Sequence, residues 1–211
     1  MVGVPLAIYF GVNAALGKFV ENYTDLEPID LPTVEMAEAD LTMLRERVET
    51  FREAIKNNES SLPLELTSEE INALIFHDAQ LQKLKGKAFL EFEENALKGQ
   101  ISIPLSDLKI DSDEPRYING SGTFKISVQE GKLSVVIQSI ELKGKKLPES
   151  IRAVIQGKNL FENAQLDPEA QKLMRRLKKL EVREGKLVLE LNEEPPAEIE
   201  GNTDFEGSNA L

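Results

Sequence analysis

The pattern of hydrophobic and polar positions begins with a long amphipathic helix. From residue 34 onward, apolar residues recur at alternating intervals of three and four, which places them on one stripe of a helix. Thr33 is a suitable N-cap and Asn57-Asn58 a suitable stop, so we predict a helix over residues 33–57. This stripe must be buried, either against the chain's own sheet or in a coiled coil with a second copy. Its members are Val34, Ala37, Leu41, Leu44, Val48, Phe51 and Ile55.

A second helix is indicated by the sequence Leu66-Thr-Ser-Glu-Glu-Ile71. Thr67 and Glu70 have the spacing of a capping box, and the flanking leucine and isoleucine have that of a hydrophobic staple. Because the apolar face continues more loosely beyond this start, we predict that the helix runs up to Gly86.

The hydrophobic period then becomes two residues, which is typical of strands. Alternation on both sides of Glu94-Asn95 and of Glu130-Gly131 predicts two antiparallel hairpins. The alternation slips after Ile137, and a β-bulge near Gln138-Ser139 would keep both sets of apolar side chains on the buried face.

The last elements follow the same logic. Asp167-Pro168 is a cap followed by proline, and it opens a predicted helix that carries Leu173, Leu177 and Leu180. One more hairpin, with its turn at Glu184-Gly185, closes the core.

The predicted fold class is α+β: an N-terminal apolar anchor helix and a long amphipathic helix, then a curved antiparallel sheet of hairpins with helices packed on it. We divide the chain into an anchor segment (1–20), a tether with the long helix (21–60), an α+β domain (61–191) and an acidic tail (192–211). The tail has too few apolar residues to form a core, so we expect it to be disordered.

Charge adds a prediction of location. Residues 1–17 carry no charge, although the chain has a formal net charge of −12. We interpret this apolar run as the outer part of a membrane-anchoring helix whose cationic start precedes Met1; the alternatives are a signal peptide and a buried helix of a soluble domain. The anchor predicts a single-pass membrane protein with most of its chain outside the cytoplasm, in the periplasm or cell envelope.

One region of the chain is basic. Residues 141–191 carry 12 basic and 8 acidic side chains, whereas residues 192–211 carry six acidic and no basic ones. The densest basic cluster is predicted to lie on a helix, either as a solvated face or as a contact with anionic lipid headgroups. The acidic balance of the whole chain argues against nucleic acid as a partner. The cluster comprises Lys172, Arg175, Arg176, Lys178 and Lys179.

No pattern in the sequence requires catalysis, a metal or another cofactor. There is no cysteine, and His77 is the only histidine. The acidic segment of residues 107–114 could be compared with a calcium-binding loop, but it lacks the glycine and the final glutamate of an EF-hand. We therefore interpret it as a solvated acidic loop. Gly120-Ser121-Gly122 lies within a strand pattern and lacks the complete nucleophile elbow, so it is better explained by a bend or a close backbone approach.

Several of these segments together resemble a known family. The capped helix start with Asn72, the Gly99–Pro104 strand, Gly122-Thr-Phe124 and the stretch from Ile140 to Pro148 resemble the YpmS-like membrane-anchored bacterial proteins of unknown function. The likeness to the LmeA-like envelope proteins is more distant. The resemblance implies a helix laid on a curved antiparallel sheet outside the cytoplasmic membrane, with a lipid-handling role. The long helix at 33–57 and the acidic tail depart from that family's pattern.

Two hypotheses of function follow, and an enzyme comes third. In the first, helices cover one sheet face only partly and leave an apolar groove for an acyl chain or another apolar ligand. In the second, helices cover that face fully, and the domain is an anchored scaffold with a dry core that binds proteins, with the 33–57 helix as one contact for a partner. The candidate groove residues are Leu90, Phe92, Ile101, Ile103, Phe124, Ile126, Val135 and Ile137.

Overall fold

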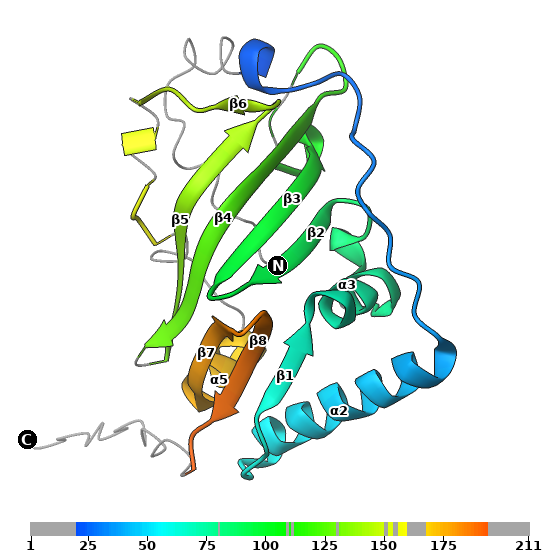
Figure 1. Ribbon diagram of the computed structural model, residues 1–211, viewed down its shortest axis with the longest axis vertical. Helices are drawn as coiled ribbons and strands as arrows, with labels where there is room; N and C mark the ends of the chain where they lie inside the picture. The colour runs from blue at the N-terminus through cyan, green and yellow to red at the C-terminus, as the bar shows by residue number, and fades with distance from the viewer. Residues whose placement is uncertain are drawn as a thin grey trace, which may run out of the picture.

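The computed structural model describes residues 20–79, 81–108, 110, 112–129, 131–149, 152–153, 156–159 and 168–193. It confirms the α+β class and the antiparallel pairing, but the strands form two sheets, and the larger sheet is not strongly curled (Figure 1). The three-stranded sheet has the order β1-β8-β7, with β1 at Leu64–Thr67, β7 at Leu177–Arg183 and β8 at Lys186–Leu191. The five-stranded sheet has the order β2-β3-β4-β5-β6, with β2 at Ala88–Glu93, β3 at Ala96–Pro104, β4 at Tyr117–Gln129, β5 at Lys132–Leu142 and β6 at Lys145–Lys146.

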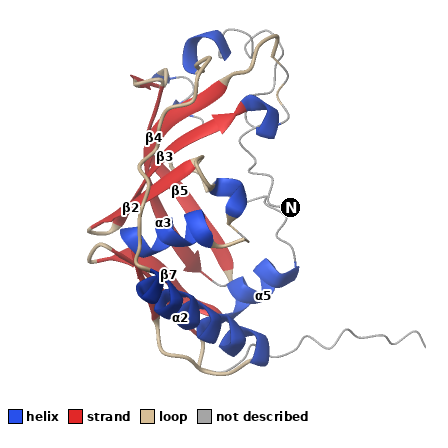
Figure 2. Cartoon of the chain, turned by 90° about the vertical axis from the view of Figure 1, so that its right-hand side faces the viewer, coloured by secondary structure: helices blue, strands red, loops and turns tan. Residues whose placement is uncertain are grey.

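Residues 20–23 and 152–153 are helical, and three longer α-helices accompany the strands. They are α2 (Glu38–Asn57), α3 (Ser68–His77) and α5 (Pro168–Arg176), with short 3-10 helices η2 (Gln82–Leu84) and η3 (Leu105–Leu108). Figure 2 shows the strands along the left of the view, with α5 to their right.

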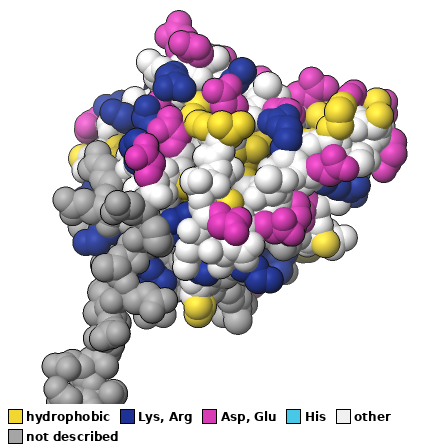
Figure 3. Space-filling model, turned by 90° about the horizontal axis from the view of Figure 1, so that it is seen from below, with side chains coloured by type: hydrophobic (Ala, Val, Ile, Leu, Met, Phe, Trp, Pro, Cys, Tyr) yellow, Lys and Arg dark blue, Asp and Glu magenta, His cyan; other side chains and the backbone are white. Residues whose placement is uncertain are grey.

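The first hydrophobic core joins α2 to the smaller sheet. Leu41, Leu44, Val48, Phe51 and Ile55 of the predicted stripe are all buried. They pack with side chains from β1, α3, α5, β7, β8 and the far end of β4. The stripe is therefore used within the chain, and a partner that contacts α2 would have to meet its outward face. Seen from below, this end of the molecule carries interspersed acidic and basic side chains with small hydrophobic patches between them (Figure 3).

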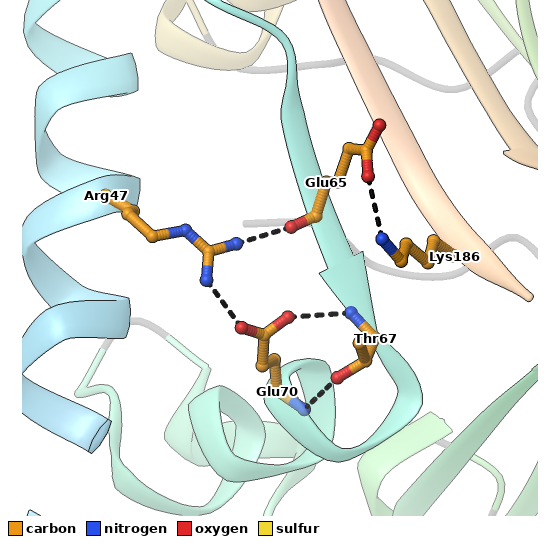
Figure 4. A network of polar contacts seen from close by, with 5 residues as sticks. All are labelled: Arg47, Glu65, Thr67, Glu70 and Lys186. Atoms are coloured by element: carbon orange, nitrogen blue, oxygen red, sulfur yellow. Dashed lines mark hydrogen bonds and ion pairs between the residues drawn. The ribbon is translucent and has the colours of Figure 1, made fainter.

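The capping box at the start of α3 is confirmed. The Thr67 backbone N–H donates to Glu70 Oε2 at 2.8 Å, and the Glu70 backbone N–H donates to Thr67 Oγ1 at 3.2 Å. Arg47 of α2 reaches the same carboxylate at 2.6 Å and donates to the Glu65 carbonyl at 2.5 Å, so this network ties α2 to β1 and α3 (Figure 4). At the other end of the network, Lys186 of β8 lies 2.9 Å from the Glu65 carboxylate, and its hydrogen bond and charge lower the pKa of Glu65.

The Glu70 carboxylate gives a pH-dependent prediction. Burial acts to raise its pKa, but the hydrogen bond from the Thr67 backbone and the contact with Arg47 outweigh it, so the pKa lies below the ordinary 4.5. Its stabilising contribution is therefore complete above the unfolded-state pKa and is lost as the pH falls through the lower folded-state value. We expect Glu70→Gln to lower the free energy of unfolding by about 0.5–1 kcal/mol at neutral pH, and this loss to shrink in acid.

Urea unfolding over a range of pH measures this effect. Glu69→Gln is the matched control, because Glu69 is an exposed carboxylate of the same first helical turn. A difference between the Glu70→Gln and native chains that stays constant from neutral to acidic pH would contradict the assignment.

The second hydrophobic core lies on the apolar face of the larger sheet. Leu105, Ile118, Ile137, Leu142 and Leu147 are buried there. The β4–β5 register passes from Thr123↔Ser139 to Phe124↔Ile137, so Gln138 has no partner across the pair. This is the predicted β-bulge, and it keeps Ile137 and Ile140 on the same face.

An asparagine side chain covers part of each long edge of the larger sheet. Asn72 of α3 is 5% exposed; its Nδ2 donates to the Leu90 carbonyl at 2.6 Å, and its Oδ1 accepts from the Leu90 N–H at 2.9 Å. At the other edge, Asn159 accepts from the Val135 N–H at 2.9 Å and donates to the Leu133 carbonyl at 2.9 Å. Each amide takes the place of a neighbouring strand, which leaves these positions unavailable for pairing with another chain.

Three predicted element boundaries are wrong. The long helix begins at Glu38 rather than at Thr33, with Ala37 as an N-cap that makes no side-chain hydrogen bond. The second helix ends at His77, where Asp78 takes an extended conformation, and only a 3-10 turn follows before Gly86. The helix after Pro168 ends at Arg176, and strand β7 starts at once. Strand β1 was not predicted.

The membrane topology also needs correction. In the part of the chain that the structure describes, no helix combines the length and the apolar character that crossing a bilayer requires. This finding contradicts the predicted single-pass membrane protein with an extracytoplasmic bulk. The proposed anchor segment (1–20) lies outside the described residues except for Val20, and so does the acidic tail beyond Glu193.

Candidate functional site

A hollow of about 850 Å³ lies on the polar face of the five-stranded sheet, the face opposite the second core. Strands β2 to β5 form its floor, and one wall is the extended segment of residues 24–29, which we call the strap. The turn at Lys143-Gly144 contributes to its rim. In Figure 1 the strap continues along one side of the sheet towards α2.

The strand register places the floor residues in two rows across the sheet. The first row contains Glu91, Lys98, Thr123 and Ser139, which are successive cross-strand partners from β2 to β5. The second row contains Gln100, Ser121 and Glu141. Cross-strand partners have Cβ atoms about 4.5–5.5 Å apart, so each row forms a continuous polar surface.

The carboxylates of the floor differ in their pairing. Lys98 Nζ lies 2.6 Å from Glu93 Oε2, so this lysine is already engaged. Among the described residues, Glu91 and Glu141 have no ion pair with a basic side chain. The floor thus offers two unpaired carboxylates beside three hydroxyl groups and one amide, an arrangement rich in hydrogen-bond acceptors.

Buried polar side chains hold the strap in place. Asn119, which is 4% exposed, donates through Nδ2 to Asp25 Oδ2 at 3.0 Å and to the Glu27 carbonyl at 2.8 Å. Its Oδ1 accepts from Ser102 Oγ at 2.9 Å, and Ser102 in turn accepts from the Ile29 N–H. Lys143 Nζ lies 3.2 Å from Asp25 Oδ1. Because these buried groups satisfy one another, the wall of the hollow is preorganised.

Glycines in the floor strands leave room for neighbouring side chains on the apolar face of the sheet. A Cβ built on Gly122 would lie 2.9 Å from the Phe124 ring, and one on Gly120 would lie 2.5 Å from Leu142 Cδ2. The Phe124 ring also lies 3.5 Å from the Cβ position of Gly99. Phe124 and Leu142 therefore fill the space above these glycines, which explains the Gly120-Ser121-Gly122 sequence as a close approach.

The register places the eight candidate groove residues on one face, opposite the hollow. Leu90, Phe92, Ile101, Ile103, Phe124, Ile126, Val135 and Ile137 alternate with the floor residues along their strands. Phe92 and Ile137 are buried, at 7% and 4% exposure, and the other six are partly exposed. Ile126 packs against the first core, whereas Ile101 and Phe124 pack against the second. None of the eight lines the hollow.

The predicted basic cluster is divided between a helix and a strand. Lys172, Arg175 and Arg176 belong to α5, whereas Lys178 and Lys179 belong to β7, so they do not share one helical face. Arg176 is 1% exposed and cannot take part in a surface contact in this position. Lys179 pairs with Glu181 at 2.8 Å. The interpretation as five headgroup contacts on one helix is therefore corrected.

The other chemical candidates have structural roles where they are described. The His77 ring makes an edge contact with Phe76, with ring centroids 5.0 Å apart. Asp107 pairs with Lys87 at 2.6 Å. Over the residues that the structure places, no group of three or more histidine, cysteine or acidic side chains is arranged to hold a metal ion.

Sequence reasoning did not identify the hollow. The strap belongs to the segment that was predicted to be a tether. The available signal was the run of hydroxyl and amide side chains that alternates with glycines over residues 99–102 and 119–123.

Comparisons with known proteins add no assignment. No family model, no curated protein and no solved structure matches this chain. The resemblance to the YpmS-like family therefore stays a prediction from a few short segments.

Proposed function

We propose that this protein is a non-enzymatic binding domain that holds a polar ligand in the hollow between the strap and the five-stranded sheet. The observation that carries the proposal is the floor itself, where two cross-strand rows set seven polar side chains on rigid strands. Sites built on strands keep their geometry better than sites on loops. Such a surface is suited to recognition by hydrogen bonds.

The floor indicates the chemistry of the ligand. Ionised carboxylates only accept hydrogen bonds, and Glu91 and Glu141 have no cationic partner among the described residues. We infer a ligand that donates hydrogen bonds through ammonium or hydroxyl groups. The net charge of −12 agrees with this choice, because it attracts cations and repels anions.

This proposal replaces the apolar groove as the preferred function. Four of the candidate groove residues, Ile101, Phe124, Ile126 and Ile137, contribute to the two packed cores. Phe124 and Leu142 also occupy the space over the glycines on the apolar face of the sheet. Of the two sequence-based hypotheses, the packed core is the one that this geometry favours. The site of recognition then moves to the opposite, polar face.

NMR titration of the isotope-labelled chain tests the proposal, with spermidine as the ammonium probe and maltotriose as the hydroxyl probe. We expect at least one probe to shift the backbone amide signals of Gln100, Ser121, Thr123, Ser139 and Glu141 together. Charge-assisted hydrogen bonds contribute about 1.5–3 kcal/mol each. Glu91→Gln with Glu141→Gln should therefore weaken spermidine binding at least tenfold.

A matched control removes the same charge elsewhere. Glu46 on the outer side of α2 and Glu190 on β8 are carboxylates outside the hollow, so Glu46→Gln with Glu190→Gln should leave the affinity nearly unchanged. Equal weakening by both double variants would indicate a nonspecific charge effect. That result, or an absence of shifts at the floor with both probes, would overturn the proposed site.

A further inference from the structure

The charged side chains of the hollow do not cancel one another. Two lysines line it, and each is paired within the chain. Lys143 Nζ lies 3.2 Å from Asp25 Oδ1 and donates to the Thr24 carbonyl at 3.1 Å. Lys98 Nζ lies 2.6 Å from the carboxylate of Glu93, which is not a lining residue. Both ammonium groups are therefore already engaged, and a ligand meets an excess of carboxylates.

Three lining carboxylates remain available for a cation. Glu27 of the strap, Glu91 of β2 and Glu141 of β5 have no ion pair with a basic side chain among the residues that the structure places. Lys146 of β6 is the cross-strand neighbour of Glu141, but within the described ranges no ion pair joins the two. Because ionised carboxylates only accept hydrogen bonds and bind charged donors most strongly, these three groups favour ammonium donors.

The strap separates these carboxylates along the hollow. Its Glu27 carbonyl accepts from Asn119 of β4 at 2.8 Å, and its Ile29 N–H donates to Ser102 of β3 at 3.2 Å. The other two carboxylates lie on the outer strands of the floor, β2 and β5. From β2 to β5, the hollow therefore presents a carboxylate, an apolar side chain and two more carboxylates.

The span between the outer carboxylates sets the length of a bridging ligand. Glu91 and Glu141 lie on strands three positions apart, and Glu141 is two residues beyond Ser139, the row partner of Glu91. With strands about 4.8 Å apart and a rise of about 3.3 Å per residue, their backbones are about 16 Å apart. Ile29, which is 41% exposed, and Pro28 line the wall between them. A ligand that fits this arrangement carries cationic ends on a chain of apolar groups.

We propose that the hollow binds a linear polyamine, with one terminal ammonium group at Glu91, the other at Glu141 and the methylene groups between them against Ile29. Glu27 faces an ammonium group in the middle of the chain. The inference rests on the proposed function of the hollow and selects alkylammonium ligands over hydroxyl ligands. Once one end is bound, the second contact forms within the complex, so a chain long enough to reach both carboxylates binds much more tightly than a shorter one.

Isothermal titration calorimetry of the full chain with α,ω-diamines measures this length dependence at constant ligand charge. Octane-α,ω-diamine should bind at least tenfold more tightly than butane-α,ω-diamine, which is too short to reach both carboxylates. It should also bind at least tenfold more tightly than octylamine, which has the same alkyl chain and a single ammonium group. Equal affinities in either comparison would overturn the bridging of the two carboxylates.

Single variants assign the two ends of the ligand. Glu91→Gln and Glu141→Gln should each abolish the preference for octane-α,ω-diamine over octylamine. Glu190→Gln removes a strand carboxylate outside the hollow and should retain that preference. A preference that survives in either floor variant would overturn the assignment.

The NMR titrations distinguish failure of this inference from failure of the proposed function. If maltotriose shifts the floor amide signals and none of the amines does, the polyamine is the wrong ligand class, although the hollow still binds a ligand. If neither maltotriose nor any amine shifts these signals, the polyamine and the proposed binding function are both incorrect.

Discussion

Replacing Leu44 with alanine is expected to lower the free energy of unfolding by about 2–5 kcal/mol. Leu44 is 1% exposed and lies at the centre of the α2 stripe, where it packs in the first core. Part of the loss comes from the apolar surface that is removed, and part from the cavity that is left behind. The cavity remains because the neighbours on β1 and α5 belong to other elements and cannot all move into it. The free energy of unfolding of a domain is usually about 5–15 kcal/mol, so Leu44→Ala removes a large share of that stability.

Met43→Ala is the matched control for this substitution. Met43 precedes Leu44 in the same helix but is 55% exposed, so its truncation should change the free energy of unfolding by less than about 0.5 kcal/mol. Urea unfolding measures both values, and light scattering reports the oligomeric state. If Leu44→Ala instead dissociated an oligomer and left the unfolding midpoint unchanged, the stripe would be an interface between copies rather than part of the core.

The accuracy of the sequence-based prediction depended on how local the determining contacts are. The capping box at Thr67 and Glu70 and the bulge at Gln138 were predicted because each follows from residues close in the sequence. In the case of the bulge, a slipped alternation leaves only one way to keep Ile137 and Ile140 on the buried face. The hairpin turns were predictable for the same reason.

The helix and strand at α5 and β7 show why other boundaries were missed. Leu173, Leu177 and Leu180 have helical spacing, yet Leu177 and Leu180 lie on a strand. The register of β7 with β8 shifts between Leu177 and Lys179, and this irregularity changes the alternation that would have indicated a strand. Strand β1 is four residues long and pairs with β8 more than a hundred residues later, a contact that no local pattern contains.

The hollow was missed for a different physical reason. A polar side chain on the outer face of a strand has the same sequence pattern whether it faces bulk water or the floor of a cavity. What distinguishes Ser121 and Glu141 is the strap above them, and Asn119 and Tyr117 fix the strap through contacts across about ninety residues of sequence. Asn119 belongs to the run of amide, hydroxyl and glycine residues at 119–123, which was the local sign of such a contact.

The second large effect on stability is expected from substitution of a glycine in the floor strands. Gly120→Ala is expected to lower the free energy of unfolding by about 1–3 kcal/mol or more, because the new Cβ would lie 2.5 Å from Leu142 Cδ2 and 2.8 Å from the Glu141 carbonyl oxygen. A leucine side chain can rotate away, but the carbonyl belongs to the paired strand β5. The variant must therefore separate β4 from β5 directly under the second polar row.

Gly99→Ala is the control, since its Cβ would meet Phe124 and Leu90 at 3.5 and 3.6 Å, which are ordinary contact distances. It should be neutral or stabilising by up to about 1 kcal/mol, because alanine restricts the unfolded chain. Gly120→Ala should also shift the backbone amide signals of Ser121 and Glu141, whereas Gly99→Ala should leave them in place. If both variants were equally stable, the close approach of the two strands at Gly120 would be incorrect. The rigid floor, on which ligand binding in the hollow depends, would then also be incorrect.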